Sequence, residues 1–126
     1  MIEQLESRTM FSVPASPTNL TATLDVQGKF IAVNLQWQDN ADNEEQYQIM
    51  RCVDGYCDGN AWTQVAFLPA NSTTYTDHIH KGYNYVYSVR ALNYEGASQD
   101  WAQVLVVTTN RTFAKFSTAR ISDLLK

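Results

Sequence analysis

The sequence predicts an all-β protein, a sandwich of two antiparallel sheets built from seven strands. Two stretches, residues 31–37 and 83–91, alternate almost throughout between apolar and polar side chains. That period of two is typical of strands with one buried face. Clusters of turn-forming residues separate these stretches from several shorter β-type runs, and no helical pattern lies between them. A sandwich of short strands accounts for all three observations.

The expected strands follow one another with regular turns between them. A turn at residues 27–29 separates the first two, and the polar loop 39–45 precedes the third. The run Val104–Val107 is apolar at every position, which predicts burial on both faces or an edge covered by the chain ends. In chain order the expected strands cover residues 19–24, 31–37, 47–52, 62–68, 73–77, 83–91 and 103–109.

Side chains at alternate positions of these strands are predicted to form the core. Trp37 is large enough to fill the middle of a sandwich, and we expect a structural role for it rather than a ligand platform. The predicted core residues are Leu20, Val33, Leu35, Trp37, Tyr47, Ile49, Val65, Tyr75, Tyr85, Tyr87 and Val89.

Composition narrows the possible functions. A chain of 126 residues is long enough for one domain with its own core. The formal net charge is −4 and no basic stripe is present, so we expect no nucleic-acid partner. No apolar run approaches the roughly 20 residues that span a bilayer, so we expect no membrane span.

The two cysteines predict a disulfide. Cys52 and Cys57 flank a segment containing Asp54-Gly55, a dipeptide that favours a hairpin turn and would place the two thiols opposite each other. Closing so short a loop stabilises by about 2 kcal/mol, enough to staple a hairpin rather than the whole fold. Free thiols and half of a metal site are the alternatives, and the disulfide implies an oxidising compartment.

Several segments in fixed order resemble a known family. They read PTNLTA at residues 17–22, LQWQDN at 35–40, EQYQIMR at 45–51, TYTD at 74–77 and YVYSVRALN at 85–93. In this order the stretch of about 14–109 resembles the fibronectin type III domains of secreted and surface bacterial proteins. The resemblance implies an immunoglobulin-like sandwich with a tyrosine corner at Tyr85, whose hydroxyl would bond an upstream backbone group. Lys81-Gly82 replaces the family's usual Pro-Gly before that tyrosine.

The chain ends are assigned separately from the domain. We expect residues 1–13 to be a leader or disordered segment, 14–110 the domain, and 111–126 a tail that forms a helix or begins a further region. Residues 5–12 resemble a short motif near the start of exported bacterial proteins, although Ser7 stands where that motif has Pro.

The sequence contains little that indicates a catalytic site or a metal site. His78 and His80 have no acidic or thiol partner nearby in sequence, so we interpret them as exposed residues. The acidic loop 39–45 lacks the glycine of a calcium-binding turn, and we interpret it as a solvated face. We therefore expect no enzyme activity, no cofactor and no metal.

Aromatic side chains near turns form the best candidate binding surface: Tyr56, Trp62, Tyr94 and Trp101. The alternative for the two tryptophans is that they cap the open ends of the core. We expect a monomeric, non-catalytic extracellular or cell-surface module that acts as a spacer or adhesion domain of an exported protein. Its partners would be other domains of that protein, surface proteins or polysaccharide. A carbohydrate-binding accessory module using the aromatic residues is the alternative function.

Overall fold

The computed structural model describes residues 12–109 and 118–120, and these residues form nine strands. Each of the seven predicted strands is present. Two additional short strands, Gly96–Ala97 and Thr118–Arg120, have no alternating pattern that could have predicted them. The strands are β1 Thr18–Gln27, β2 Phe30–Gln38, β3 Gln46–Val53, β4 Thr63–Pro69, β5 Thr74–His80, β6 Tyr85–Asn93, β7 Gly96–Ala97, β8 Ala102–Val107 and β9 Thr118–Arg120.

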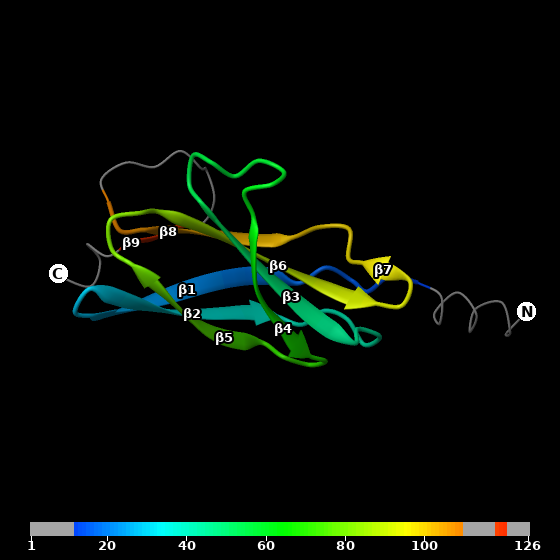
Figure 1. Ribbon diagram of the computed structural model, residues 1–126. Coiled ribbons are helices and arrows are strands. Elements are labelled where there is room, and N and C mark those ends of the chain that lie inside the picture. Colours follow the sequence, from blue (N-terminus) through cyan, green and yellow to red (C-terminus); the bar gives the residue numbers. More distant parts are fainter. Residues whose placement is uncertain (1–11, 110–117, 121–126) are drawn as a thin grey trace, which may run out of the picture.

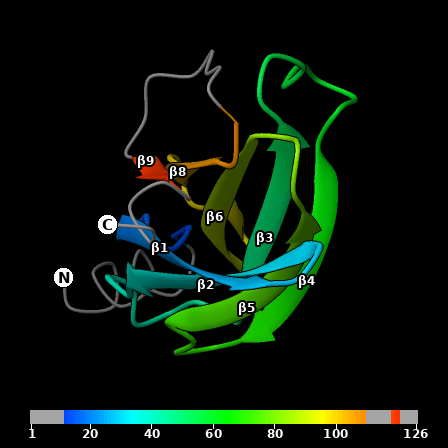
Figure 2. The same cartoon turned by 90° about the vertical axis from the view of Figure 1, so that its left-hand side faces the viewer.

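The strands form two sheets packed face to face, which confirms the predicted sandwich (Figure 1). One sheet has three strands in the order β1-β2-β5. The other has six, in the order β4-β3-β6-β8-β9 with β7 paired to β6. All pairings are antiparallel except that of β8 with β9, which is parallel. Figure 2 shows the smaller sheet lying across one face of the larger one.

The alternation in β2 directs its apolar side chains into the sandwich. Ile31, Val33, Leu35 and Trp37 are buried, while Gln36 is exposed. The Trp37 ring lies 5.7 Å from the ring of Tyr47 in the opposite sheet, at the centre of the main core. Its Nε1 has no hydrogen-bond partner among the described residues.

Most predicted core residues are buried, and the rest lie at its margin. Val65, Tyr75 and Tyr85 are half-buried and pack against the main cluster. The buried ones are Leu20, Val33, Leu35, Trp37, Tyr47, Ile49, Tyr87 and Val89.

Two tyrosine hydroxyls and one ion pair supply polar links around this core. Tyr87 donates to Asp77 Oδ2 at 2.6 Å, and Arg51 pairs with the same oxygen at 2.6 Å, which joins the two sheets. Tyr47 donates to Asp39. The tyrosine corner expected at Tyr85 is absent from the described residues. Instead the Tyr85 ring lies 5.5 Å beneath the Arg51 guanidinium, because Arg51 enters the sandwich at that end.

Strand β8 is buried on both faces, as its unbroken apolar run predicts. Val104 and Val106 face the main core, whereas Leu105 and Val107 belong to a second cluster on the other side of the sheet. The edge of β8 pairs with β9, a piece of the predicted tail 111–126. The remaining tail residues and the predicted leader up to residue 11 lie outside the described residues.

A candidate binding groove on the outer face of the six-stranded sheet

The six-stranded sheet has an outer face, turned away from the three-stranded sheet, that carries its own apolar cluster. Because side chains alternate along a strand, Val86 of β6 points out while its neighbours Tyr85 and Tyr87 point into the main core. Val86 pairs with Cys52 on one side and Leu105 on the other. These residues are buried, so something must cover them.

The cover is the loop of residues 54–62 between β3 and β4, which rises on the outer side of the sheet (Figure 1). Its path begins with a β-turn in which the Tyr56 N–H donates to the Val53 carbonyl at 2.9 Å. Gly55 occupies the third position with a φ of 93°, which a glycine adopts without steric cost. The turn sends the chain back over the sheet, so that Cys57 and Trp62 pack on the outer cluster.

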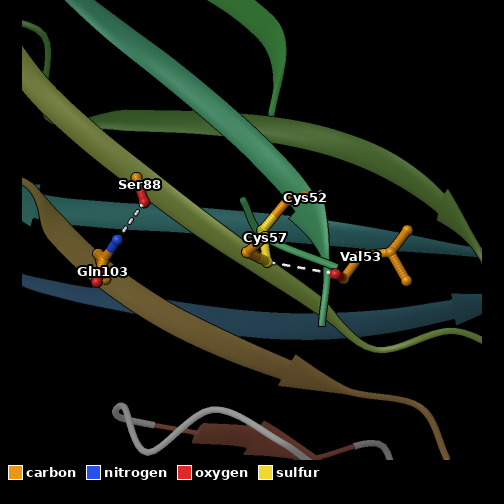
Figure 3. Close-up of a disulfide and its surroundings, with 5 residues drawn as sticks. All are labelled: Cys52, Val53, Cys57, Ser88 and Gln103. Atoms are coloured by element: carbon orange, nitrogen blue, oxygen red, sulfur yellow. Dashed lines mark hydrogen bonds between the residues drawn. A yellow bond between two sulfur atoms is a disulfide. The ribbon is translucent and has the colours of Figure 1, made fainter. Parts of the chain in front are cut away.

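A disulfide between Cys52 and Cys57 anchors this loop (Figure 3). The Cys57 sulfur also lies 3.3 Å from the Val53 carbonyl oxygen, a close contact rather than a hydrogen bond because a disulfide sulfur carries no proton. The sequence predicted a hairpin stapled across its turn. In the structure β4 begins only at Thr63, which pairs with Arg51, and the disulfide instead pins a long loop to the outer face.

Beside this loop lies a groove of about 390 Å³, here called the outer groove. Trp62, at the end of the loop, and Trp101, just before β8, give it aromatic walls. The strands β3, β6 and β8 supply the remaining side chains. The lining residues are Met50, Gly59, Trp62, Ser88, Trp101 and Gln103.

The floor of the outer groove carries polar groups beside the apolar side chain of Met50. The Gln103 side-chain amide donates to the Ser88 hydroxyl oxygen at 2.9 Å between neighbouring strands (Figure 3). Ser88 is buried, with 2% of its surface exposed, so the accessible polar group is Gln103, whose amide keeps a second N–H and a carbonyl oxygen. The floor can therefore offer both donors and acceptors to a ligand.

Arg90 extends the polar surface along β6, two residues beyond Ser88 and on the same face. Its Nε donates to Gln48 Oε1 at 2.8 Å, and the Gln48 amide donates to Gln64 Oε1 at 3.1 Å. Its guanidinium lies 4.2 Å from the centre of the Trp101 ring, a cation–π contact that holds both side chains. Partial burial lowers the Arg90 pKa from its ordinary value, and the group stays protonated at neutral pH.

The four aromatic residues predicted as a binding surface separate into different places. Trp62 and Trp101 meet at the outer groove, and neither belongs to the main core cluster. Trp101 also lines a second hollow beside the start of β1. Tyr56 is 71% exposed in the covering loop. Tyr94 is 94% exposed at the β6–β7 turn, where it lines a separate hollow with Glu45 and residues of β3 and β6. Sequence separation hid the pairing, because Trp62 and Trp101 are brought together only by the order β3-β6-β8.

The acidic loop 39–45 differs from the solvated face that its composition predicted. Glu44 is buried and accepts a hydrogen bond from the Asn71 N–H at 2.9 Å. This bond supports the β4–β5 turn, in which Asn71 has a φ of 68°. Asp39 accepts from the Tyr47 hydroxyl, and Glu45 accepts from the Tyr94 N–H. These carboxylates organise neighbouring loops.

Within residues 12–109 and 118–120, no group of three or more histidine, cysteine or acidic side chains is placed to share a metal ion. His78 and His80 are exposed on β5, and the His80 ring lies 4.6 Å from that of Phe30. In the same part of the chain, no helix has the length and apolar character needed to cross a membrane.

Comparison with known proteins gives structural likeness without sequence relatives. No known family model matches the chain, and no curated protein matches it. A fibronectin type III-like protein from Clostridium thermocellum superposes with a TM-score of 0.57 and 28% identity, over 81% of this chain and 100% of that one. Domains of titin superpose with a TM-score of 0.55 and 24% sequence identity, over 77% of this chain and 32% of the titin chain. The twitchin kinase region of C. elegans superposes with a TM-score of 0.53 and 22% sequence identity, over 75% of this chain and 17% of the twitchin chain.

The fold is therefore that of a fibronectin type III domain, as the sequence resemblance implies. The chain spans only part of the titin and twitchin structures, and their activities belong to those proteins. The likeness supports a non-catalytic module for protein interaction or spacing.

Proposed function

We propose that this chain is a non-catalytic spacer and interaction module of an exported protein, placed at the cell surface or outside the cell. Its partners are the neighbouring domains of that protein and surface proteins. The observation that carries the proposal is the position of the two points where the described sandwich begins and ends.

The chain enters before β1 and leaves β8 at opposite ends of the long axis of the sandwich (Figure 1). Strand β9 runs parallel to β8 and ends at the same end as β8, with Arg120 paired to Val107. The Ser12 carbonyl accepts hydrogen bonds from the side-chain amides of Asn43 and Asn93. At the other end, the N–H groups of Thr108 and Thr109 donate to the Asn84 side chain. The nine-residue strand β6 lies between Asn84 and Asn93, so the two points are about 30 Å apart at 3.3 Å per residue. Domains attached at these points would be held apart by the length of the sheet.

The disulfide supports an exported location. Bonds of this kind form and persist in oxidising compartments and are rare in the cytosol. Cys52 and Cys57 are bonded to each other, and the described residues contain no free cysteine.

Spin labels on Ser12→Cys and Thr109→Cys test the spacing role, with the native disulfide kept intact. Pulsed electron paramagnetic resonance should give one narrow distance distribution centred near 30 Å, because both points are tied to the sandwich by side-chain hydrogen bonds. A centre below about 20 Å, or a broad distribution, would show that the chain does not set a fixed separation.

The alternative function, an accessory carbohydrate-binding module, is favoured by the outer groove with its two tryptophans over a polar floor. Affinity electrophoresis through gels that contain soluble polysaccharides distinguishes the two. Retarded migration supports carbohydrate binding, whereas unchanged migration across a broad panel supports spacing and protein interaction alone.

A further inference from the structure

The outer groove combines two kinds of surface that one class of ligand matches. Trp62 and Trp101 contribute indole rings, whose faces carry partial negative charge. The Arg90 guanidinium covers one face of Trp101, so a ligand stacks on the other face of that ring. The C–H groups on one side of a pyranose ring carry partial positive charge and form a flat apolar patch, so they stack on such rings. An entirely apolar ligand would leave the polar floor without partners, which costs free energy.

The floor matches the other side of a sugar. Sugar hydroxyls both donate and accept hydrogen bonds, and the second N–H and the carbonyl oxygen of Gln103 do the same, while buried Ser88 holds that amide in place. The planar amide of Gln48 and the terminal nitrogens of Arg90 continue this surface on the next row of the sheet. These side chains stand on strands and are already tied to one another, so little ordering is needed when a ligand binds.

The charge around the outer groove decides between neutral and anionic saccharides. The loop 54–62 presents the exposed Asp58, and the segment 98–101 presents the exposed Asp100, with no basic residue in either. The Arg90 Nε already donates a hydrogen bond to Gln48, and the face of its guanidinium is already in contact with the Trp101 ring. The whole chain carries a formal charge of −4. A polyanion would be repelled as it approached this surface.

We infer that the outer groove binds one or two rings of an uncharged polysaccharide, stacked on Trp62 and Trp101 and hydrogen-bonded to Gln103. The volume of about 390 Å³ lies near the lower end of the range for small-ligand sites, which limits the number of rings. The inference rests on the carbohydrate-binding alternative proposed above and names its ligand class.

The test is affinity electrophoresis of the full chain under non-reducing conditions. The gels contain hydroxyethyl cellulose, xyloglucan, glucomannan, galactomannan or xylan, and a separate gel contains polygalacturonate. We expect retardation by at least one uncharged polymer and none by polygalacturonate. No retardation by any uncharged polymer, or stronger retardation by polygalacturonate, would overturn the inference.

Matched variants locate the binding surface. Trp101→Ala and Gln103→Ala should each weaken the retardation, with at least a tenfold rise in Kd for Trp101→Ala. Tyr94→Ala removes an aromatic ring that is more exposed than either groove tryptophan and lines a separate hollow, and it should change nothing. Equal loss in Tyr94→Ala, or full binding in Trp101→Ala, would place the ligand elsewhere. Trp62 also packs on the outer cluster, so Trp62→Ala can weaken binding by destabilising the fold. Its binding result is therefore used only if its melting temperature equals that of the unsubstituted protein.

The experiments distinguish failure of the polysaccharide-binding inference from failure of the proposed spacing role. A chain that keeps the 30 Å label distance yet binds no polysaccharide remains a spacer, and only the ligand class is overturned. A chain that binds through Trp101 but shows a broad distance distribution retains the groove and loses the spacing role.

Discussion

Replacing Trp37 by alanine should cost about 3 kcal/mol of unfolding free energy. An indole of this size removes about 150–250 Å² from water, worth about 4–6 kcal/mol at about 25 cal/mol per Å². Trp37 is 3% exposed, so nearly all of that area is buried. Large-to-small aromatic substitutions measure about 3–5 kcal/mol. The unpartnered Nε1 already costs the native state about 1–3 kcal/mol, and the substitution removes that cost.

Urea denaturation followed by fluorescence or circular dichroism measures the difference. Gln36→Ala is the matched control, since its side chain is exposed on the opposite face of β2 and should change stability by less than about 0.5 kcal/mol. Trp37→Phe keeps a ring without the unpartnered N–H and should fall clearly between the two. Equal small effects at Trp37 and Gln36 would contradict the register of β2, and with it the packing of the two sheets.

Three further predictions follow from the loops and the buried tyrosines. Reducing the Cys52–Cys57 disulfide should lower the unfolding free energy by about 2 kcal/mol and leave the sandwich folded, because the closed loop is short; complete unfolding on reduction would contradict this. Burial, and then the bond to a carboxylate, raises the pKa of Tyr47 and Tyr87. The unfolded chain therefore loses these protons first, so the stabilisation that these two tyrosines contribute should be fully present below about pH 9 and be lost as the pH rises above about 10; constant stability from about pH 9 to about pH 12 would refute it. Excess calcium should leave the melting temperature unchanged, because carboxylates of the loop 39–45 are engaged in internal hydrogen bonds, and a clear rise would reverse this interpretation.

The sequence predicts buried side chains most reliably in a strand that has one face in the core and the other exposed to solvent. In β2 the alternation alone places Val33, Leu35 and Trp37 inside, because a shift by one residue would expose all of them. In β6 the same rule assigns Tyr87 and Val89 correctly. It is silent on Val86, because burial of an outward side chain depends on a loop that folds over the sheet.

Features that depend on contacts between distant segments of the chain could not be predicted from the sequence. The burial of Glu44 follows from its bond to Asn71, 27 residues away. The role of the disulfide depends on the path of the loop after Gly55, and a six-residue window is compatible with a hairpin as well. The groove itself required the neighbouring positions of β3, β6 and β8, which no local pattern contains.

Nuclear magnetic resonance of the three indole N–H groups tests the proposed recognition surface most directly. The chain has three tryptophans, of which Trp62 and Trp101 line the outer groove and Trp37 lies in the core. On titration with oligosaccharides from the polymer that retards the protein, the signals of Trp62 and Trp101 should shift together with one saturation curve. The Trp37 signal should stay in place. A shift of the Trp37 signal without the other two, or no shift of either groove tryptophan at saturating sugar, would contradict the account.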